Sequence, residues 1–477
     1  MRPAAPETIG LRGPVSTFRK LFQSGPVLLV AFAFAVMADP VSSVAYAIEA
    51  ALRSLRGDLS LLLPTMGLVV GIIAIIIVNY HQLVGRFPEG GGAAAATGRA
   101  FDEAWAFLPI GALVVDFVLT IAISVAAGSA AIVAYFPSLG SVRIPLALLL
   151  LAFVAGLTWF GHLGRAVFAV MTIAFVGVGA AVIVAGFGGS PAAASSAAPA
   201  DPGHAPFVAV ILAFPVAMAL ATGVEAPSSA IAQLGQLDDR GRRRFGRVTL
   251  WLTLVVVGGL TLGITALAVR LGIGIPPEDS TQIAEVARAS TGGGLFAAFQ
   301  ATSALLLLAA ASSSFQAGPG LLKALARAER GDGSSIGILP AWMGRTNQHH
   351  TPYWGVILYL AASAAVVLAA AAREQELVLF YAVSVFVSFL AGLVAMARFS
   401  YKGRSWGSFA MNAFGALVVA FTLAVNLGRG YPLVSLVANA LIAGLLLRLW
   451  VRAGRPRGVS EAEAIGEEIV GEELADS

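Results

Sequence analysis

Twelve apolar runs dominate the sequence, and each is long enough to cross the hydrocarbon core of a bilayer, which takes about 20 helical residues. A chain that is 58% hydrophobic and 12% charged differs sharply from a soluble protein, in which about a quarter of the residues are charged. Because lipid offers no partner for backbone polar groups, the runs must be helical. We predict an all-α polytopic membrane protein whose twelve transmembrane helices cover 26–51, 60–80, 106–136, 143–161, 165–187, 206–234, 247–272, 293–325, 353–372, 376–398, 406–428 and 431–451.

Positive charges divide unevenly between the two ends of these runs. If the N-terminus is cytoplasmic, most Lys and Arg side chains fall on the cytoplasmic side, as the positive-inside rule requires. The exceptions are Arg53, Arg56, Arg143, Arg270, Arg288, Arg373 and Arg429. An even number of spans then puts both termini in the cytoplasm, and we expect the chain in the inner membrane of a bacterial cell.

The apolar runs also divide the chain into regions. We expect a cytoplasmic N-terminal arm (1–24), a first structural repeat that runs on through a broken sixth helix (25–234), the remainder of a second repeat (235–400), two further transmembrane helices (401–452) and an acidic cytoplasmic tail (453–477). The tail is rich in Glu and is expected to be mobile. It is too short to form a domain.

Three acids lie near the middle of predicted spans: Asp39 in the first, Asp116 in the third and Glu225 in the sixth. No Lys or Arg lies at comparable depth. Each acid costs about 2.5–3.5 kcal/mol on insertion scales, so something must balance them. Protonation or a bound cation would do so. The structural alternative is a permanently protonated acid that hydrogen-bonds between helices.

Helix breakers accompany two of these acids. Asp39 precedes Pro40, which disfavours helix at the residue before it, and Glu225 lies between Gly223 and Pro227. The resulting motifs, "DPVSS" and "EAPSS", fall in the first and sixth of twelve spans, where an inverted repeat of five plus five helices would place equivalent elements. Broken helices at membrane depth line cavities, and their freed carbonyls bind cations.

Hydroxyl groups extend this pattern. Asp116, Thr120 and Ser124 are four residues apart, so they share one helix face, although hydroxyls in membrane helices also bond back to their own turn. Tyr46 lies seven residues beyond Asp39 and therefore on its side. Tyr381 in the tenth span is either a packing residue or a hydroxyl ligand. The eighth span adds a polar patch of Thr302, Ser312, Ser313 and Ser314, which could complete a cavity.

The motifs "DPVSSVAY", "DFVLTIAISVAAG" and "TGVEA" resemble the amino acid-polyamine-organocation (APC) superfamily and, more narrowly, the KimA-type and KUP-type potassium uptake permeases. The resemblance covers roughly residues 25–400 and implies the five-plus-five inverted-repeat fold (APC/LeuT-type) with broken first and sixth helices. It also implies a potassium path, with Glu225 as the acid that couples protons. The residues expected on that path are Asp39, Ser43, Tyr46, Asp116, Thr120, Ser124, Thr222 and Tyr381.

The sequence departs from those permeases in three places. "TGVEA" continues as "PSS" where a form such as "ISN" is expected, and 320–350 lacks the usual pattern. KimA-type proteins carry a cytoplasmic nucleotide-binding domain after the last span, where this sequence has only the acidic tail. Control by cyclic dinucleotides through such a domain is therefore not expected.

The leading hypothesis is proton-coupled uptake of a monovalent cation, with potassium and protons as the transported species and no cofactor. The alternative is a proton-coupled amino acid or polyamine permease on the same fold, and a transporter-like sensor that moves nothing remains a third reading. An enzyme is not expected, because no nucleophile and base are paired at membrane depth. The expected partners are the cation, protons and lipid, with no nucleic acid and a possible homodimer.

Overall fold

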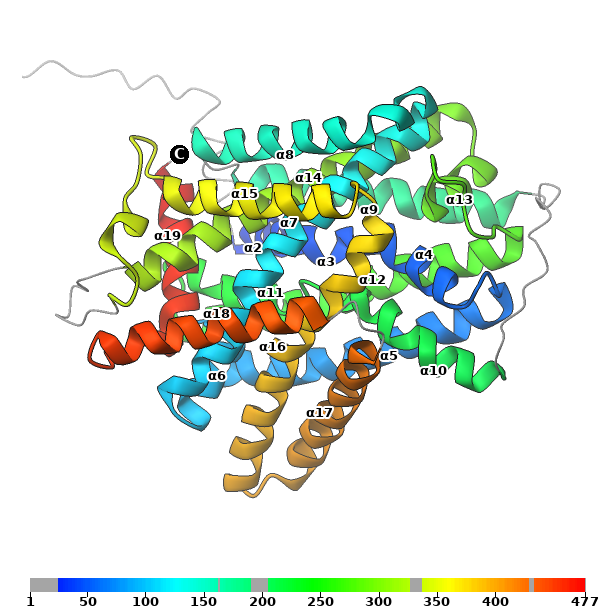
Figure 1. The fold of residues 1–477 in the computed structure, drawn as a ribbon. Helices are drawn as coiled ribbons and strands as arrows, with labels where there is room; N and C mark the ends of the chain where they lie inside the picture. Colours follow the sequence, from blue (N-terminus) through cyan, green and yellow to red (C-terminus); the bar gives the residue numbers. More distant parts are fainter. Residues whose placement is uncertain (1–24, 162–163, 190–204, 327–336, 429–432, 477) are drawn as a thin grey trace, which may run out of the picture.

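The computed structural model describes residues 25–161, 164–189, 205–326, 337–428 and 433–476. These residues form helices and connecting turns, and no strand occurs among them (Figure 1). The predicted N-terminal arm (1–24) lies outside the described residues.

Ten helices within the described ranges are long and apolar enough to cross a membrane. One is the composite run 206–233. The others are α5 (Leu59–Arg86), α7 (Phe107–Tyr135), α8 (Arg143–Trp159), α9 (Arg165–Gly188), α12 (Asp239–Leu271), α14 (Gly293–Ala326), α16 (Glu374–Lys402), α17 (Trp406–Leu427) and α18 (Leu433–Arg452). Two shorter apolar helices, α2 (Gly25–Val36) and α15 (Tyr353–Ala369), fall on the remaining predicted runs. The all-helical prediction is confirmed.

The first apolar run is divided but not unwound. It continues from α2 into α3 (Ala38–Ser42) and α4 (Val44–Ser54). The junction residues, Met37 and Ser43, both keep right-handed helical backbone, with φ of −73° and −62°. Pro40 has no N–H to donate to the carbonyl four residues earlier, yet the helical hydrogen bonds continue on both sides of it, from Met37 N to Ala33 O (2.9 Å) and from Val41 N to Met37 O (3.0 Å). The expected opening beside Asp39 is therefore absent, and the run has only junctions between helices at Met37 and Ser43.

The composite run 206–233 is interrupted by non-helical backbone. Its parts are α10 (Pro206–Ala217), η3 (Met218–Ala221), α11 (Ala226–Ala230) and η4 (Ile231–Gln233). Between η3 and α11, Thr222 is extended (φ −62°, ψ 140°) and Gly223 has φ of +74°. Only glycine adopts that left-handed conformation without steric cost, so Gly223 fixes the break. Pro227 follows in the first turn of α11.

Both interruptions lie in the centre of the bundle. Figure 1 shows α3 and α11 surrounded by longer helices, and α14 packs against α3, α7 and α9. The ends of α4 and α10 and helix α13 (Gln282–Ser290) lie at one end of the molecule, and α19 (Ala462–Asp476) lies at the other. The two acids at the interruptions are thus far from either end.

The connections contain short elements that the apolar pattern does not predict. Besides α13 and α19 they are α6 (Gly92–Ala100), η1 (Glu103–Ala106), η2 (Pro137–Val142), η5 (Ala341–Gly344) and η6 (Val459–Glu461). The acidic tail forms a packed helix over much of its length, since Ile465 and Ile469 are buried in a cluster with Trp450 of α18. It contacts α6, α11, η4 and α14.

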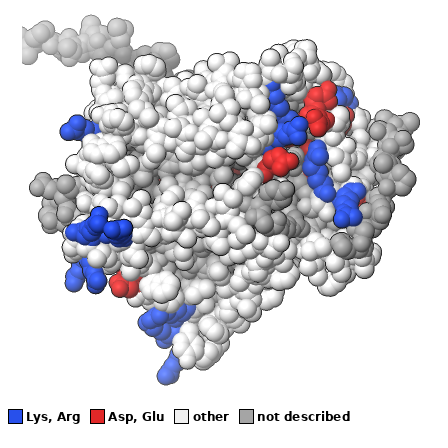
Figure 2. Space-filling model, viewed as in Figure 1, with Lys and Arg blue, Asp and Glu red and all other residues white. Residues whose placement is uncertain are grey.

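Charged side chains gather at the left, the right and the lower edge of the face shown in Figure 2, and a broad area without charge lies between them. The exposed side chains of the apolar helices include Leu149, Phe153 and Leu441. Exposed apolar side chains of this kind suit contact with lipid chains.

Candidate functional site

Three acids occupy the centre of the bundle, each on a different element. Asp39 lies in α3, Asp116 in the middle of α7, and Glu225 directly before α11. Asp116 and Glu225 are 5% and 8% exposed. Each of the three has one buried carboxylate oxygen for which the described residues supply no hydrogen-bond partner. A buried acceptor without a partner is costly, so these oxygens favour a proton or a ligand.

The three carboxylates are near enough to affect one another. Asp116 interacts electrostatically with Glu225 and with Asp39, and Glu225 also interacts with Asp39. No ion pair found in the described ranges involves any of them. Like charges held together in a low dielectric cannot all stay ionised without a counter-charge. The site therefore has a deficit of positive charge.

Gly223 brings the two interruptions into contact. A Cβ atom on this glycine would lie 2.7 Å from Asp39 Cγ and 2.9 Å from Pro40 Cδ. The absence of a side chain thus permits both the positive φ angle and the close approach to α3. As a result, Thr222 and Glu225 lie beside Asp39 although they are far from it in sequence.

Hydroxyl groups surround the acids. Tyr46 is 1% exposed, its hydroxyl is 3.0 Å from Ser43 Oγ, and it interacts electrostatically with Asp39 and Asp116. On α7, Thr120 and Ser124 are each 1% exposed. Ser124 Oγ has no partner among the described residues.

Thr222 Oγ1 donates a 3.0 Å hydrogen bond to the Ala219 carbonyl, which leaves its own lone pairs available. The structure therefore brings Asp39, Tyr46, Asp116, Thr222 and Glu225 to one region. Tyr381 lies in α16, but its side chain is outside the described part of the chain.

Sequence reasoning missed three buried hydroxyl residues. Tyr80 of α5 interacts electrostatically with Glu225 and Asp116, and Tyr359 of α15 interacts with Asp116. Ser384 of α16 is buried, and its hydroxyl has no partner within the described ranges. Lone tyrosines and serines in apolar runs are common packing residues, so no spacing signal distinguishes these three.

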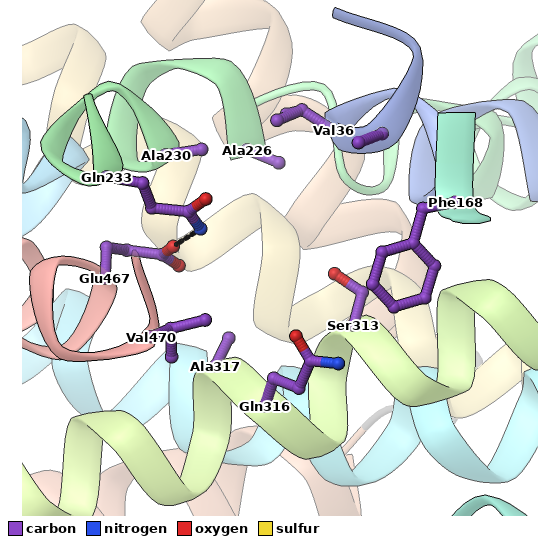
Figure 3. Close-up of a pocket in the computed structure, with 11 residues that line it drawn as sticks. Val36, Phe168, Ala226, Ala230, Gln233, Ser313, Gln316, Ala317, Glu467 and Val470 are labelled. Atoms are coloured by element: carbon purple, nitrogen blue, oxygen red, sulfur yellow. Dashed lines mark hydrogen bonds between the residues drawn. The ribbon is translucent and has the colours of Figure 1, made fainter. Parts of the chain in front are cut away.

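A cavity of about 70 Å³ begins directly after Glu225, at Ala226. Figure 3 shows Gln233 and Glu467 on one side of it, with Ser313 and Gln316 of α14 on the other. Gln233 Nε2 donates a 2.6 Å hydrogen bond to Glu467 Oε2. The volume accommodates a few water molecules, and the polar lining makes it a wet space.

A larger cavity, of about 350 Å³, lies between α7, α15, α16 and α18. Its lining is apolar apart from Ser435. It holds none of the three acids and no group suited to a cation, so the smaller polar cavity is the one relevant to charge.

Two comparisons with known proteins find relatives of this chain. The chain is 28% identical over 411 residues to the potassium transporter KimA of Bacillus subtilis (strain 168), in an alignment that covers 81% of this chain and 64% of KimA. The chain thus spans less than two thirds of the length of that relative. It also matches the amino acid permease family over residues 28–447. That match takes in both interruptions, all three central acids and the apolar helices around them, so the chain is an integral membrane protein that belongs to the amino acid permease family.

Proposed function

We propose that this protein is a secondary active transporter that takes up potassium together with protons. The observation that carries the proposal is the charge deficit at the centre, where Asp39, Asp116 and Glu225 each keep a buried oxygen without a partner in the described ranges. A monovalent cation bound beside these acids would relieve that deficit. Potassium is proposed in part because the relative at 28% identity is a potassium transporter.

The oxygen ligands favour a monovalent cation over a divalent metal. Within the described residues, no three His, Cys, Asp or Glu side chains come together as a metal-binding group. The central acids are instead separated and interspersed with the hydroxyls of Tyr46, Thr222 and Ser124. A large, weakly charged ion is bound by such neutral oxygens together with carbonyls. No resident cofactor is part of this proposal.

Glu225 is proposed as the group that couples protons to uptake. It stands between the acid cluster and the polar cavity that begins at Ala226. A carboxyl at that boundary can exchange a proton with water on one side and respond to a cation beside Asp39 on the other. Asp39 and Asp116 are then the binding acids.

The proposal includes a membrane arrangement. We propose twelve spans with two inverted repeats of five helices, both termini in the cytoplasm and a location in the bacterial inner membrane. The interruptions at Asp39 and at Gly223 support it, because they fall on the helices that the repeat relates. The positive-inside distribution supports the orientation.

Transport of an amino acid or a polyamine is the second candidate, and the family match favours it. Three acids without a cationic partner could bind the ammonium groups of a polyamine as well as a potassium ion. A zwitterion is less well suited, because its carboxylate would meet three negative groups.

The test is rescue of a bacterium that lacks potassium uptake, grown at low external potassium. We expect the wild type to restore growth and rubidium uptake. Asp39→Asn should abolish both, and Asp279→Asn, at an exposed position, should leave both intact. Inserted protein that gives no rescue and no rubidium uptake, yet is stabilised against heat by amino acids or polyamines, would refute the potassium assignment.

A further inference from the structure

Helix α19 is docked against the interrupted sixth run, at the end of the bundle seen on the left of Figure 1. Its neighbours are α11 and η4, which follow Glu225, together with α6 and α14. No part of the proposed transport chemistry requires a helix in this place.

One buried contact joins α19 to α11. Glu463 is 7% exposed, and its carboxylate accepts hydrogen bonds from the Ser229 hydroxyl and the Ala94 backbone amide. Ser229 is four residues beyond Glu225. Ala94 lies in the first turn of α6, whose exposed amides and dipole favour a negative group.

A run of three glycines makes room for this carboxylate. Gly90, Gly91 and Gly92 have φ angles of +92°, +90° and +49°. A Cβ atom on Gly92 would lie 2.8 Å from Glu463 Oε1, and one on Gly90 would lie 2.9 Å from the Ser229 carbonyl oxygen. The turn before α6 is thus shaped around the contact between α11 and α19.

A second contact lies one helical turn further along both segments. Glu467 accepts the 2.6 Å hydrogen bond from Gln233. Ser229 and Gln233 are four residues apart, as are Glu463 and Glu467, so the two pairs form successive rungs between the same helix faces. Both contacts join the same two helix faces, so both form when α19 docks and both break when it leaves.

The backbone of α19 lies close to the backbones of α14 and η4. A Cβ atom on Gly466 would lie 3.0 Å from the Leu321 amide nitrogen of α14, and one on Gly471 would lie 2.9 Å from Gln233 Cα. Glycines at these positions let α19 approach both elements closely. Docking is therefore specific to this surface and not a loose association of an acidic segment.

Docked α19 also covers one side of the polar cavity. Glu467 and Val470 form one wall, opposite Ser313 and Gln316 (Figure 3). Ala226, Ala230 and Gln233 form the adjoining wall. Removal of α19 would leave the space beside Glu225 without that wall.

The connection before α19 is held separately. Glu103 accepts hydrogen bonds from the amide nitrogens of Ser460 (2.9 Å) and Gly458 (3.2 Å). These bonds do not involve α11 or η4. The helix can therefore leave the cavity while its start stays attached, which keeps it close enough to redock.

We propose that α19 is an autoinhibitory latch on the transporter, that is, a helix that blocks uptake while it is docked. Glu463 and Glu467 hold it in the docked position. When α19 is docked, α11 and η4 are held and one side of the cavity beside Glu225 is covered. When α19 is released, the interrupted helix is free to move and the cavity becomes more open to the aqueous side on which α19 lies. The inhibitory role rests on the proposed transport function, whereas the covering of the cavity does not.

Thiol labelling tests this covering directly. The natural sequence has no cysteine, so Ser313→Cys places a single thiol in the cavity wall. In inside-out vesicles, Glu463→Ala with Glu467→Ala should raise the rate of labelling by a water-soluble maleimide on the order of tenfold, as expected for the loss of two hydrogen bonds. Glu468→Ala, an exposed acid on the same helix, is the matched control and should not change the rate.

Cross-linking tests the inhibition. Ser229→Cys with Glu463→Cys places one thiol on each side of this contact, so a short bis-methanethiosulfonate reagent should join α11 to α19. We expect rubidium uptake to fall on cross-linking and to recover with a reductant, which also shows that the variant is folded.

The outcomes separate the two proposals. Equal labelling of the latch variant and its parent would overturn the latch. Increased labelling with no rubidium uptake by any variant would support the latch and overturn potassium transport. Uptake that persists unchanged in the cross-linked protein would overturn the inhibitory role.

Discussion

The two interrupted runs carry similar motifs, yet their backbones differ. In the first, "DPVSS" remains right-handed from α2 to α4, with junctions between helices at Met37 and Ser43. In the sixth, "EAPSS" follows a true break at Thr222 and Gly223. An acid beside a proline therefore does not open a helix by itself. The glycine three residues before Ala226 does, because it supplies the positive φ angle that the break needs.

The first serines of the two motifs have equivalent partners, since Ser42 donates to the Asp39 carbonyl at 2.6 Å and Ser228 donates to the Glu225 carbonyl at 2.8 Å. The second serines differ. Ser43 pairs with Tyr46 within the first run, whereas Ser229 reaches Glu463 on α19. Only the sixth run is thus connected through its serines to α19 at one end of the molecule.

The largest effect is expected from Gly223→Ala. A Cβ atom there meets Asp39 and sits on a left-handed residue, which together should lower the free energy of unfolding by about 2 kcal/mol or more and abolish uptake. Gly444→Ala, where a Cβ atom meets nothing within 4 Å, is the control. Thermal unfolding in detergent and rubidium uptake are the measurements. Normal uptake by Gly223→Ala would show that the break is not needed.

Glu225→Gln should separate the roles of the two interruptions. We expect uptake driven by a proton gradient to fall by about two orders of magnitude, the range for loss of an essential proton-transfer group. Thermal stabilisation by potassium should partly persist, because Asp39 and Asp116 remain. Asp39→Asn should instead remove that stabilisation. Proton influx that is unchanged in Glu225→Gln vesicles would contradict its coupling role, and Glu278→Gln at an exposed site is the control.

A smaller effect is expected from a change of pH, because it alters the contact between Glu463 of α19 and the sixth run. Burial raises the pKa of the Glu463 carboxyl from 4.5 to about 7. Release would restore the ordinary pKa, so docking is strongest below pH 4.5 and weakens until the pH reaches about 7. Labelling of Ser313→Cys should therefore increase from about pH 5 to pH 7 and then level off.

The control for this pH profile is Glu463→Gln, in which the contribution of that carboxyl should vanish and only the pH dependence of the thiol itself remains. Parallel profiles for the two proteins would contradict the titration. Other charged or titratable groups on or next to the elements packed around this carboxyl are Glu467, Glu225, Tyr80, Arg99, Glu461 and Lys323.

The smallest effect is expected from Pro40→Ala. Because the backbone stays right-handed on both sides of Pro40, its replacement by Ala restores an N–H that the carbonyl four residues earlier can accept. We expect thermal stability to change by less than about 1 kcal/mol and uptake to be nearly normal. A severe loss of uptake would show that the first interruption depends on the proline itself.

The positions of the apolar helices could be predicted because length and hydropathy are properties of single segments. Helices α6, α13 and α19 could not, since they are short or charged and are stabilised by contacts with distant elements. The docking of α19 depends on Gly466 and Gly471, which in isolation lower helix propensity. These glycines favour docking only in the folded protein, where α14 and η4 lie beside them.

Within the candidate site, the acids were predictable because burial of charge in a membrane is costly wherever it occurs. Tyr80 and Tyr359 were not, because an aromatic residue in an apolar run gives the same pattern whether it packs or binds. The pair formed by Ser229 and Glu463 joins residues separated by 234 positions, and no local spacing connects them. Long-range pairing of this kind has no signature in a single sequence.

Because α19 follows the apolar helices in the chain, the wall that it forms in the polar cavity is made after the rest of the bundle. Synthesis proceeds from the N-terminus, so every apolar helix from α2 to α18 is made before Glu463 and Glu467 emerge. The cavity beside Glu225 therefore has one wall missing while the bundle is inserted, and it acquires that wall only after α18 has been made. A ribosome that stopped between α18 and α19 would release a bundle with this side of the space uncovered.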